Sequence, residues 1–292
     1  MACWLKAVWA NKFVYLFLLP LLIPVVIFGY LPAVQAFSLS IISERGKFTG
    51  LENFVILFTD KVLGKSAVNM LWLLLAGMLT ANIPAFIMAE LLYGIKSRQT
   101  SGLYRFFFII PMMIPVTVIM LLWRYLMLDP LNGLVNAILI RFGIAPLGWL
   151  GEVKTALPGL MLIGFPWMAG TNLLIYLAGI QNIPESVIES ATLDGARILR
   201  RIFMIDIPLL VGQFKLLIVL GIINGIQGFQ LQYMATSDGG PAYATMVPGL
   251  WMYRRAFQFS DFEYGSTIGV AMFLVILFFS YLNIKFIHTD NL

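Results

Sequence analysis

The sequence predicts an all-α integral membrane protein with about six transmembrane helices. Of its 292 residues, 60% are hydrophobic and only 11% are charged, and the mean hydropathy is +0.90. Soluble domains instead contain about 45–50% apolar and about 25% charged residues. The apolar residues form long stretches separated by short polar segments, and a membrane helix needs about 20 such residues in a row. We therefore expect one transmembrane domain over residues 1–292.

The apolar stretches give the expected spans in chain order. The first span covers about residues 13–41, and the core spans lie within about residues 67–287, at about 67–92, 106–128, 157–180, 208–233 and 265–287. Pro20, Pro24 and Pro32 interrupt the first span and predict kinks, which membrane helices tolerate. Between the third and fourth spans, residues 133–142 are expected to form a short amphipathic helix.

Composition excludes several classes of function. The net charge of +5 comes from Lys and Arg residues scattered over short loops, as in helical membrane proteins generally, so it predicts no nucleic-acid surface. Cys3 and His288 are the single cysteine and the single histidine, which leaves no disulfide framework and no His or Cys metal site. We therefore expect no metal site and no catalytic residue.

An ATPase within this chain and an ion-coupled transporter are also disfavoured. Gly64, Lys65 and Ser66 look like the end of a phosphate-binding loop, but Thr59 stands where that motif requires glycine. Ion-coupled transporters keep ionisable groups at mid-membrane, whereas Glu90 lies close to a span end. Energy for any transport should therefore come from outside this chain.

The most informative segment is the polar stretch at residues 183–209, between the fourth and fifth spans. Pro184 suits the first turn of a helix that should run to about Leu193, and Gly195 then allows a turn before a second helix from about Ala196. On that second helix one side carries Arg197, Arg200 and Arg201 and the other carries Ile198, Leu199, Ile202 and Phe203. One face can dock into a groove while the other faces water or a partner.

This stretch resembles the EAA loop of ABC importer permeases, in which E-A-A is followed by a glycine and then by I-x-L-P. Here Glu189, Ser190 and Ala191 precede Gly195, and Pro208 closes the pattern; Ser replaces the first Ala, and the late Leu is missing. The resemblance implies a coupling helix that docks on a cytoplasmic ATPase. The protein would then lie in a bacterial or archaeal plasma membrane, with both chain ends on the cytoplasmic side. The residues it assigns to coupling are Glu185, Glu189, Ser190, Ala191, Asp194, Gly195 and Arg197. The plainer alternative is a solvated loop between spans.

The fifth span carries amides that favour a polar cavity. Asn224, Gln227, Gln230 and Gln232 are costly in lipid and should face a partner helix or water. Amides beside aromatic rings suit a sugar, because hydroxyls pair with amides and apolar sugar faces stack on rings. Helix packing is the alternative, since Gly221 and Gly225 form a G-x-x-x-G pattern.

Further motifs extend the resemblance to the sugar-importing permeases. They include F-T-G-L-E-N-F after the first span and G-G-P after the fifth. The resemblance implies substrate contacts in the fifth span, and we take the candidate contacts to be Asn224, Gly225, Gln227, Gly228 and Gln230 there, with Trp167 and Thr171 in the fourth span. Packing is an equally good interpretation of Trp167.

The resemblance also implies partners and a mechanism. It implies a second, similar permease, two ATP-binding subunits that hold ATP and Mg²⁺, and an extracellular solute-binding protein, with no cofactor in this chain. Transport of a sugar or oligosaccharide would then proceed by alternating access. The alternatives are an ABC permease for a different polar solute and an ion-coupled secondary transporter.

Overall fold

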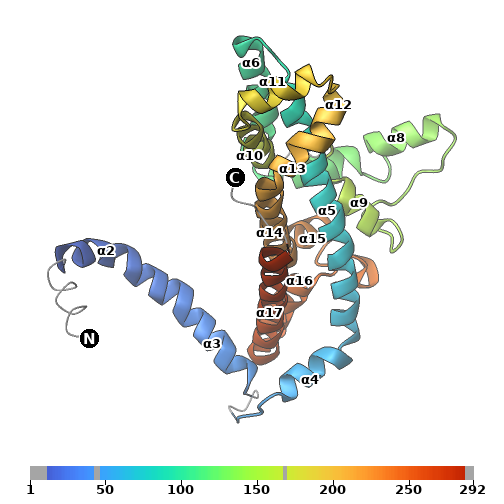
Figure 1. Cartoon of the computed structure of the whole chain (residues 1–292). Helices are drawn as coiled ribbons and strands as arrows, with labels where there is room; N and C mark the ends of the chain where they lie inside the picture. The colour runs from blue at the N-terminus through green and yellow to red at the C-terminus, as the bar shows by residue number, and fades with distance from the viewer. Residues whose placement is uncertain (1–11, 43–46, 167–169, 287–292) are drawn as a thin grey trace. The chain divides into compact units, whose positions relative to one another are not determined.

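A computed structural model describes residues 12–42, 47–166 and 170–286 of the chain (Figure 1). Within these ranges the structure is helical, and the only β-pairing is an isolated bridge between Ile42 and Phe48. The all-α prediction is therefore confirmed. The chain divides into two compact units, Met1–Thr59 with Met252–Ala271 and Asp60–Trp251 with Met272–Leu292.

The first unit contains the predicted first span. Helices α2 (Lys12–Val25) and α3 (Leu31–Ser40) are joined without a break by the π-helical turn η1 (Val26–Tyr30). The turn follows Pro24, whose missing N–H interrupts the regular hydrogen-bond ladder. The segment Leu16–Ser40 is long and apolar enough to cross a membrane, and its residues 16–35 are all exposed, whereas Ser40 at its end is buried.

Two polar contacts fix the end of α3 in the first unit. Asn53 Nδ2 of α4 (Glu52–Thr59) donates to Ser40 O at 3.0 Å and to Ile42 O at 2.8 Å. Thr267 Oγ1 of α17 (Phe262–Phe286) donates to the same Ser40 carbonyl at 3.4 Å. The π-helical turn η6 (Arg254–Gln258) precedes α17, and its Arg255 forms an ion pair with Asp261.

The second unit is organised around α5 (Lys61–Tyr93). Asp60 caps its start, accepting hydrogen bonds from Val62 N at 2.8 Å and Leu63 N at 3.0 Å. Around α5 pack α9 (Ala156–Leu162), α10 (Gly170–Gln181) and α14 (Val211–Gln227). The shared core consists of Ala85, Ala89, Leu92, Leu173, Tyr176, Leu177, Ile180, Leu210 and Leu217. Small side chains at 85 and 89 let α10 approach closely.

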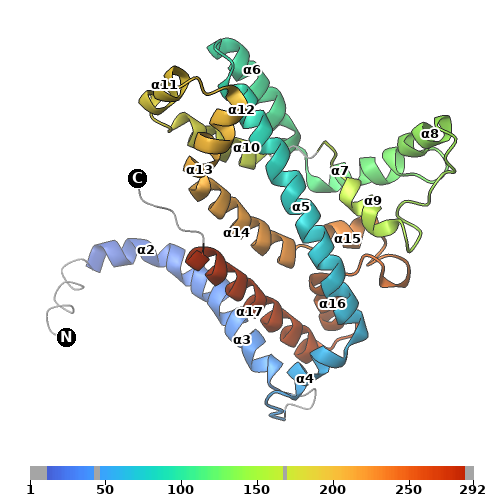
Figure 2. The ribbon, with the colours of Figure 1, turned by 45° about the vertical axis from the view of Figure 1, so that its right-hand side comes forward.

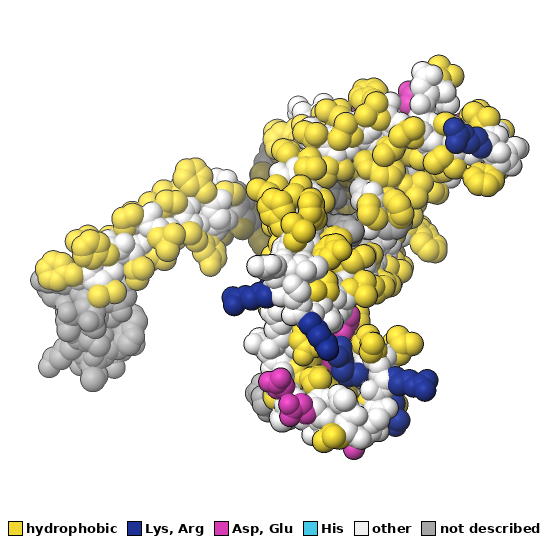
Figure 3. Space-filling view, turned by 90° about the horizontal axis from the view of Figure 1, so that it is seen from above, with side chains coloured by type: hydrophobic (Ala, Val, Ile, Leu, Met, Phe, Trp, Pro, Cys, Tyr) yellow, Lys and Arg dark blue, Asp and Glu magenta, His cyan; other side chains and the backbone are white. Residues whose placement is uncertain are grey.

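In the second unit, different helices lie beside the two halves of α5. Helices α11 (Glu185–Leu193) and α12 (Ile198–Arg201) lie beside one end of α5, while α15 (Gln230–Ala235) lies toward the other half (Figures 1 and 2). Charged side chains gather on part of the surface seen in Figure 3, whereas hydrophobic side chains cover much of the rest. Such an apolar surface suits a lipid-facing protein.

The loop after the third predicted span forms the expected short helix, α8 (Leu134–Arg141). Asn136, 1% exposed, holds the returning chain against it. Its Nδ2 donates to Leu147 O at 2.9 Å, and its Oδ1 accepts from Leu147 N at 3.1 Å and Trp149 Nε1 at 2.9 Å. This buried amide is therefore fully used in holding the loop.

The exact number of spans stays a prediction. Among the described residues, three helices are long and apolar enough to cross a membrane, in Leu16–Ser40, Lys61–Tyr93 and Phe262–Lys285. Counting two bent helix pairs as one span each raises the number to five. The expected fourth span is divided between α9 and α10, and neither helix is long enough to cross a membrane by itself.

The third and fifth spans are bent rather than straight. The pair Arg98–Met113 and Val116–Met127 is bent by 85°, at a break where Pro115 has an extended ψ of 134°. These residues form α6 (Arg98–Ile109), η2 (Ile110–Met113), α7 (Val116–Leu122) and η3 (Trp123–Met127). The fifth-span pair is bent by 67° between Leu209 and Val211. Pro208 lies within the short helix α13 (Ile207–Leu209), directly before this bend.

Candidate functional site

The 183–209 loop forms two helices joined by a tight turn, as the sequence predicted. Helix α11 ends at Leu193, and Gly195 has a φ of +74°. Ala196 N donates to Ala191 O at 2.9 Å and Gly195 N donates to Thr192 O at 3.0 Å, which together make a Schellman motif. The chain then continues through α12, the π-helical turn η4 (Ile202–Asp206) and α13. The left-handed turn is the reason for glycine at this position.

Most of the predicted coupling residues are exposed on this loop. The exposed ones are Glu185, Glu189, Ser190, Asp194, Gly195 and Arg197. Ala191 instead faces inward and is 7% exposed. Several large apolar side chains of the loop also lie on the surface, namely Leu193, Ile198, Leu199, Phe203 and Met204. Several exposed apolar side chains on one loop are typical of a docking surface or of lipid contact.

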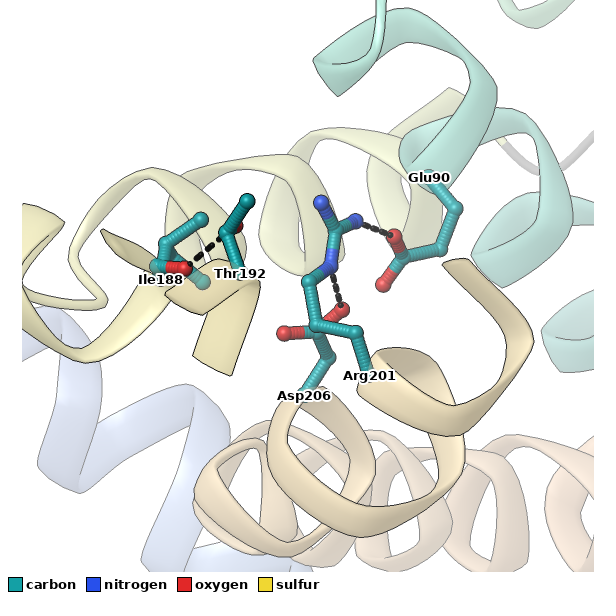
Figure 4. A network of polar contacts seen from close by, with 5 residues as sticks. All are labelled: Glu90, Ile188, Thr192, Arg201 and Asp206. Atoms are coloured by element: carbon teal, nitrogen blue, oxygen red, sulfur yellow. Dashed lines mark hydrogen bonds and ion pairs between the residues drawn. The ribbon is translucent and has the colours of Figure 1, made fainter. Parts of the chain in front are cut away.

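Arg201 differs from its two neighbouring arginines, and here the predicted face was wrong. Arg197 and Arg200 are exposed, but the Arg201 side chain is only 18% exposed and turns inward. Its Nε lies 2.9 Å from Asp206 Oδ2 and its Nη2 lies 3.1 Å from Glu90 Oε2 (Figure 4). We call Glu90, Arg201 and Asp206 the Arg201 cluster. A buried guanidinium needs such partners, and the approach of α5 supplies one of them.

The sequence pattern did not reveal this cluster, because Glu90 was interpreted alone as a residue close to a span end and Arg201 as part of a solvent-facing side. Glu90 is 8% exposed and Asp206 is 0% exposed, so neither behaves as a solvated helix-end charge. The sequence did carry a signal. Glu90 is an acidic residue near the end of an apolar span, and the 183–209 loop, which is rich in arginine, was expected at the same end of the spans. Opposite charges at the same end of neighbouring helices favour an ion pair.

A cavity of about 530 Å³ lies in the second unit, between α5 and the break that separates α14 from α15. Its wall includes five predicted substrate residues, Asn224, Gly225, Gln227, Gly228 and Gln230. We call it the amide cavity. Helix α14 ends where Gly228 adopts a ψ of 129°, with Gly228 N donating to Asn224 O at 2.8 Å. A helix break with its polar backbone is tolerated at membrane depth where it lines a cavity.

Other residues complete the wall of the amide cavity. From α5 come Leu73, Leu74, Ala76, Gly77 and Thr80, and the α14–α15 side adds Phe229, Leu231 and Gln232. Gln232 is 7% exposed, and among the described residues its Oε1 has no hydrogen-bond partner. An amide oxygen of this kind is available to a ligand hydroxyl or to water. The amides therefore give the cavity donors and acceptors beside an aromatic ring.

Of the two residues predicted from the fourth span, the structure describes Thr171 alone, and Thr171 does not join this wall. Thr171 Oγ1 contacts Met112 Sδ at 3.4 Å, and Thr171 is absent from the residues that line the amide cavity. Trp167 lies outside the described residues, as do Cys3 and His288. The structure therefore brings together the five fifth-span candidates but leaves Thr171 apart.

Helix packing accounts for part of the same segment. A Cβ added to Gly225 would lie 2.4 Å from Leu74 Cδ1 of α5, and one added to Gly221 would lie 3.5 Å from Met78 Cγ. The G-x-x-x-G side of α14 thus faces α5, as the packing interpretation predicts. Packing and cavity lining are both present here, because Gly225 also belongs to the cavity wall.

Comparison with known families identifies the chain. Residues 81–289 match the family described as binding-protein-dependent transport system inner membrane component. The chain belongs to this family. It is therefore a membrane-embedded transport subunit, and the predicted resemblance to ABC importer permeases is confirmed.

Curated relatives agree over nearly the full length of this permease. It is 30% identical over 289 residues to the probable ABC transporter permease protein YurN of Bacillus subtilis, covering 96% of this chain and 98% of the relative. It is 24% identical over 278 residues to the arabinooligosaccharides transport system permease protein AraP of the same species, covering 93% and 87%. The lactose transport system permease protein LacF of Rhizobium radiobacter is 30% identical over 276 residues, with coverage of 92% and 91%.

A solved structure supports the fold of this permease independently. A chain of a bacterial ABC transporter involved in the import of the acidic polysaccharide alginate superposes with a TM-score of 0.82 at 22% identity, covering 98% of this chain and 99% of that chain. A chain of a bacterial alginate ABC transporter in complex with an alginate pentasaccharide-bound periplasmic protein gives a TM-score of 0.79 at 23% identity, covering 95% of this chain and 94% of that chain. At this identity the likeness establishes the fold alone.

Proposed function

We propose that this permease carries a sugar or oligosaccharide across the membrane through the amide cavity. The observation that carries the proposal is the set of amides at the α14–α15 break, where Asn224, Gln227 and Gln230 line one volume of about 530 Å³. Amides both donate and accept, so they match sugar hydroxyls, and Phe229 offers a ring to an apolar sugar face. The relatives named for lactose and for arabinooligosaccharides support this substrate class.

In this proposal the 183–209 loop is the contact with a cytoplasmic ATPase. The exposed Glu185, Glu189, Asp194 and Arg197 and the exposed apolar side chains of the loop supply a mixed surface for docking. Two ATP-binding subunits would hold ATP and Mg²⁺, a second permease would complete the pathway, and a solute-binding protein would deliver the sugar from outside. Both ends of this chain then lie in the cytoplasm.

Transport would follow an alternating-access cycle. Closure of the ATPases on ATP moves the docked loop, and the loop moves the spans so that the cavity opens first to one side and then to the other. The sugar biases this equilibrium only through different affinities for the two states, so the cavity must bind it more weakly when open inward.

Uptake measurements in cells test the proposal. Removal of the gene should abolish uptake of at least one labelled sugar from a panel of mono- and oligosaccharides, and the intact gene should restore it. If the deletion impairs uptake of an amino acid, peptide or metal ion and of no sugar, the sugar assignment is wrong. Uptake that survives depletion of ATP but collapses with the ion gradient would contradict the ATP-driven mechanism.

A further inference from the structure

The Arg201 cluster joins two elements that are far apart in the sequence. Arg201 and Asp206 both belong to the loop segment, in α12 and η4, and their 2.9 Å pair lies within that segment. The 3.1 Å pair between Arg201 and Glu90 crosses to α5. Tyr93 of α5 adds a second contact, since the guanidinium carbon lies 5.4 Å from the centre of its ring. Figure 4 shows Arg201 between the two carboxylates.

The charge balance makes Arg201 the central member. Two carboxylates share one guanidinium, and among the described residues Glu90 Oε1 and Asp206 Oδ1 are buried without a hydrogen-bond partner. Loss of Arg201 would leave both carboxylates buried without any compensating charge. The planar guanidinium reaches both acids through separate N–H groups, which a lysine ammonium at the end of a flexible chain reproduces poorly.

A physical connection leads from this cluster to the amide cavity. Glu90 and the cavity-lining Thr80 belong to the same helix, α5, and lie ten residues apart, which is about 15 Å along the axis. Farther along α5, Leu74 contacts the position of Gly225 on α14. A displacement of α12 that Arg201 transmits to α5 would therefore reach the cavity wall through one continuous element.

We propose that Arg201 is the positioning residue that makes α5 move together with the 183–209 loop. The inference rests on the proposed function of that loop as the ATPase contact. A buried ion pair contributes little net stability, because desolvation offsets the attraction, so its stabilising effect alone does not explain two buried carboxylates around a half-buried arginine. Fixing the loop in one orientation against α5 does explain them. The cluster then determines how much of the ATPase motion reaches the cavity.

Two substitutions separate positioning from folding. Glu90→Gln keeps the side-chain size and leaves Arg201 paired with Asp206, so it weakens only the pair that crosses to α5. Arg201→Lys keeps the positive charge beside both carboxylates but loses the separate guanidinium N–H groups that bond the two carboxylates at the same time. Arg98→Gln is the matched control, since Arg98 is exposed at the start of α6 and its loss removes one positive charge from the surface.

The experiment measures sugar imported per ATP hydrolysed by the complete transporter in proteoliposomes, together with complex yield and the KM for ATP. We expect Glu90→Gln and Arg201→Lys to lower the ratio of import to hydrolysis by roughly two- to thirtyfold, the range of coupling effects from residues outside the ligand sites. The KM for ATP should stay unchanged, and Arg98→Gln should keep the wild-type ratio. A purely structural role would instead reduce yield and lower both activities together, with the ratio unchanged.

The outcomes distinguish this inference from the proposed function. If the unmodified complex hydrolyses ATP but imports no sugar, the proposed function fails and the positioning role fails with it. If the unmodified complex imports sugar and both variants keep its ratio, only the positioning role of Arg201 is overturned. Failure of both variants to assemble, with Arg98→Gln assembling normally, would assign the cluster to folding and would also overturn it.

Discussion

Replacing Gly195 with valine should weaken coupling through the backbone alone. Gly195 has a φ of +74°, and a Cβ built there would meet no atom within 4 Å, so the new side chain has room. The cost is therefore conformational, about 1–2 kcal/mol for placing an L-residue in the left-handed region. That energy corresponds to a roughly five- to thirtyfold lower ratio of the native turn between α11 and α12 to other conformations of the same segment.

The assay is stimulation of ATP hydrolysis by the solute-loaded binding protein, measured beside sugar uptake and complex yield. Gly195→Asn is the matched control, because asparagine is comparable in size to valine but tolerates the left-handed conformation. We expect valine to reduce stimulation and uptake several-fold at normal yield, and asparagine to stay close to wild type. Equal activity of the two variants would refute the idea that the positive φ determines the geometry of the loop.

Four further predictions concern the amide cavity, the packing of α14 on α5, the loop at α8 and the energy source. Asn224→Leu should weaken apparent uptake affinity by about five- to more than a hundredfold, at about 1–3 kcal/mol, with normal assembly, because sugar hydroxyls lose a partner. Gly225→Leu should instead reduce complex yield, since its Cβ would lie 2.4 Å from Leu74 Cδ1; lost assembly of Asn224→Leu as well, at an unchanged uptake affinity, would favour packing at both positions. Asn136→Leu should lower the free energy of unfolding by about 1–3 kcal/mol, because the backbone groups of Leu147 and the Trp149 Nε1–H lose their hydrogen-bond partner. An unchanged melting temperature would contradict this. The isolated chain should release no phosphate from ATP, because Thr59 replaces the glycine of a phosphate-binding loop, and vanadate-sensitive hydrolysis by the pure chain would oppose the permease assignment.

Local rules predicted the loop better than the spans. Pro184, Gly195 and the helical periodicity between them are short-range signals, and the helix over Glu185–Leu193 follows them closely. The amphipathic segment near 133–142 was predicted on the same basis and forms α8. The bend angles were not predictable, because prolines such as Pro115 indicate where a helix can break but not how far the neighbouring helices turn it.

Contacts between distant segments explain what the sequence analysis missed. Periodicity placed Arg201 on the solvent side, yet its partner Glu90 lies 111 positions earlier in the chain and reaches it only through packing of α5. The same limit applies to the amide cavity. The five fifth-span candidates do line one cavity, but treating residues 208–233 as one straight helix concealed the break at Gly228, which places Gln230 on a separate helix.

The most direct test of the account is ATP-dependent sugar uptake by the complete transporter. Proteoliposomes would contain this permease, its partner permease and the ATPase subunits, and would receive the solute-binding protein and a labelled sugar identified from the cell assay. The account predicts uptake that requires ATP, the binding protein and this chain together, with higher apparent KM for the sugar in Asn224→Leu. Uptake that proceeds without ATP, or that is unchanged when this chain is omitted, would contradict it.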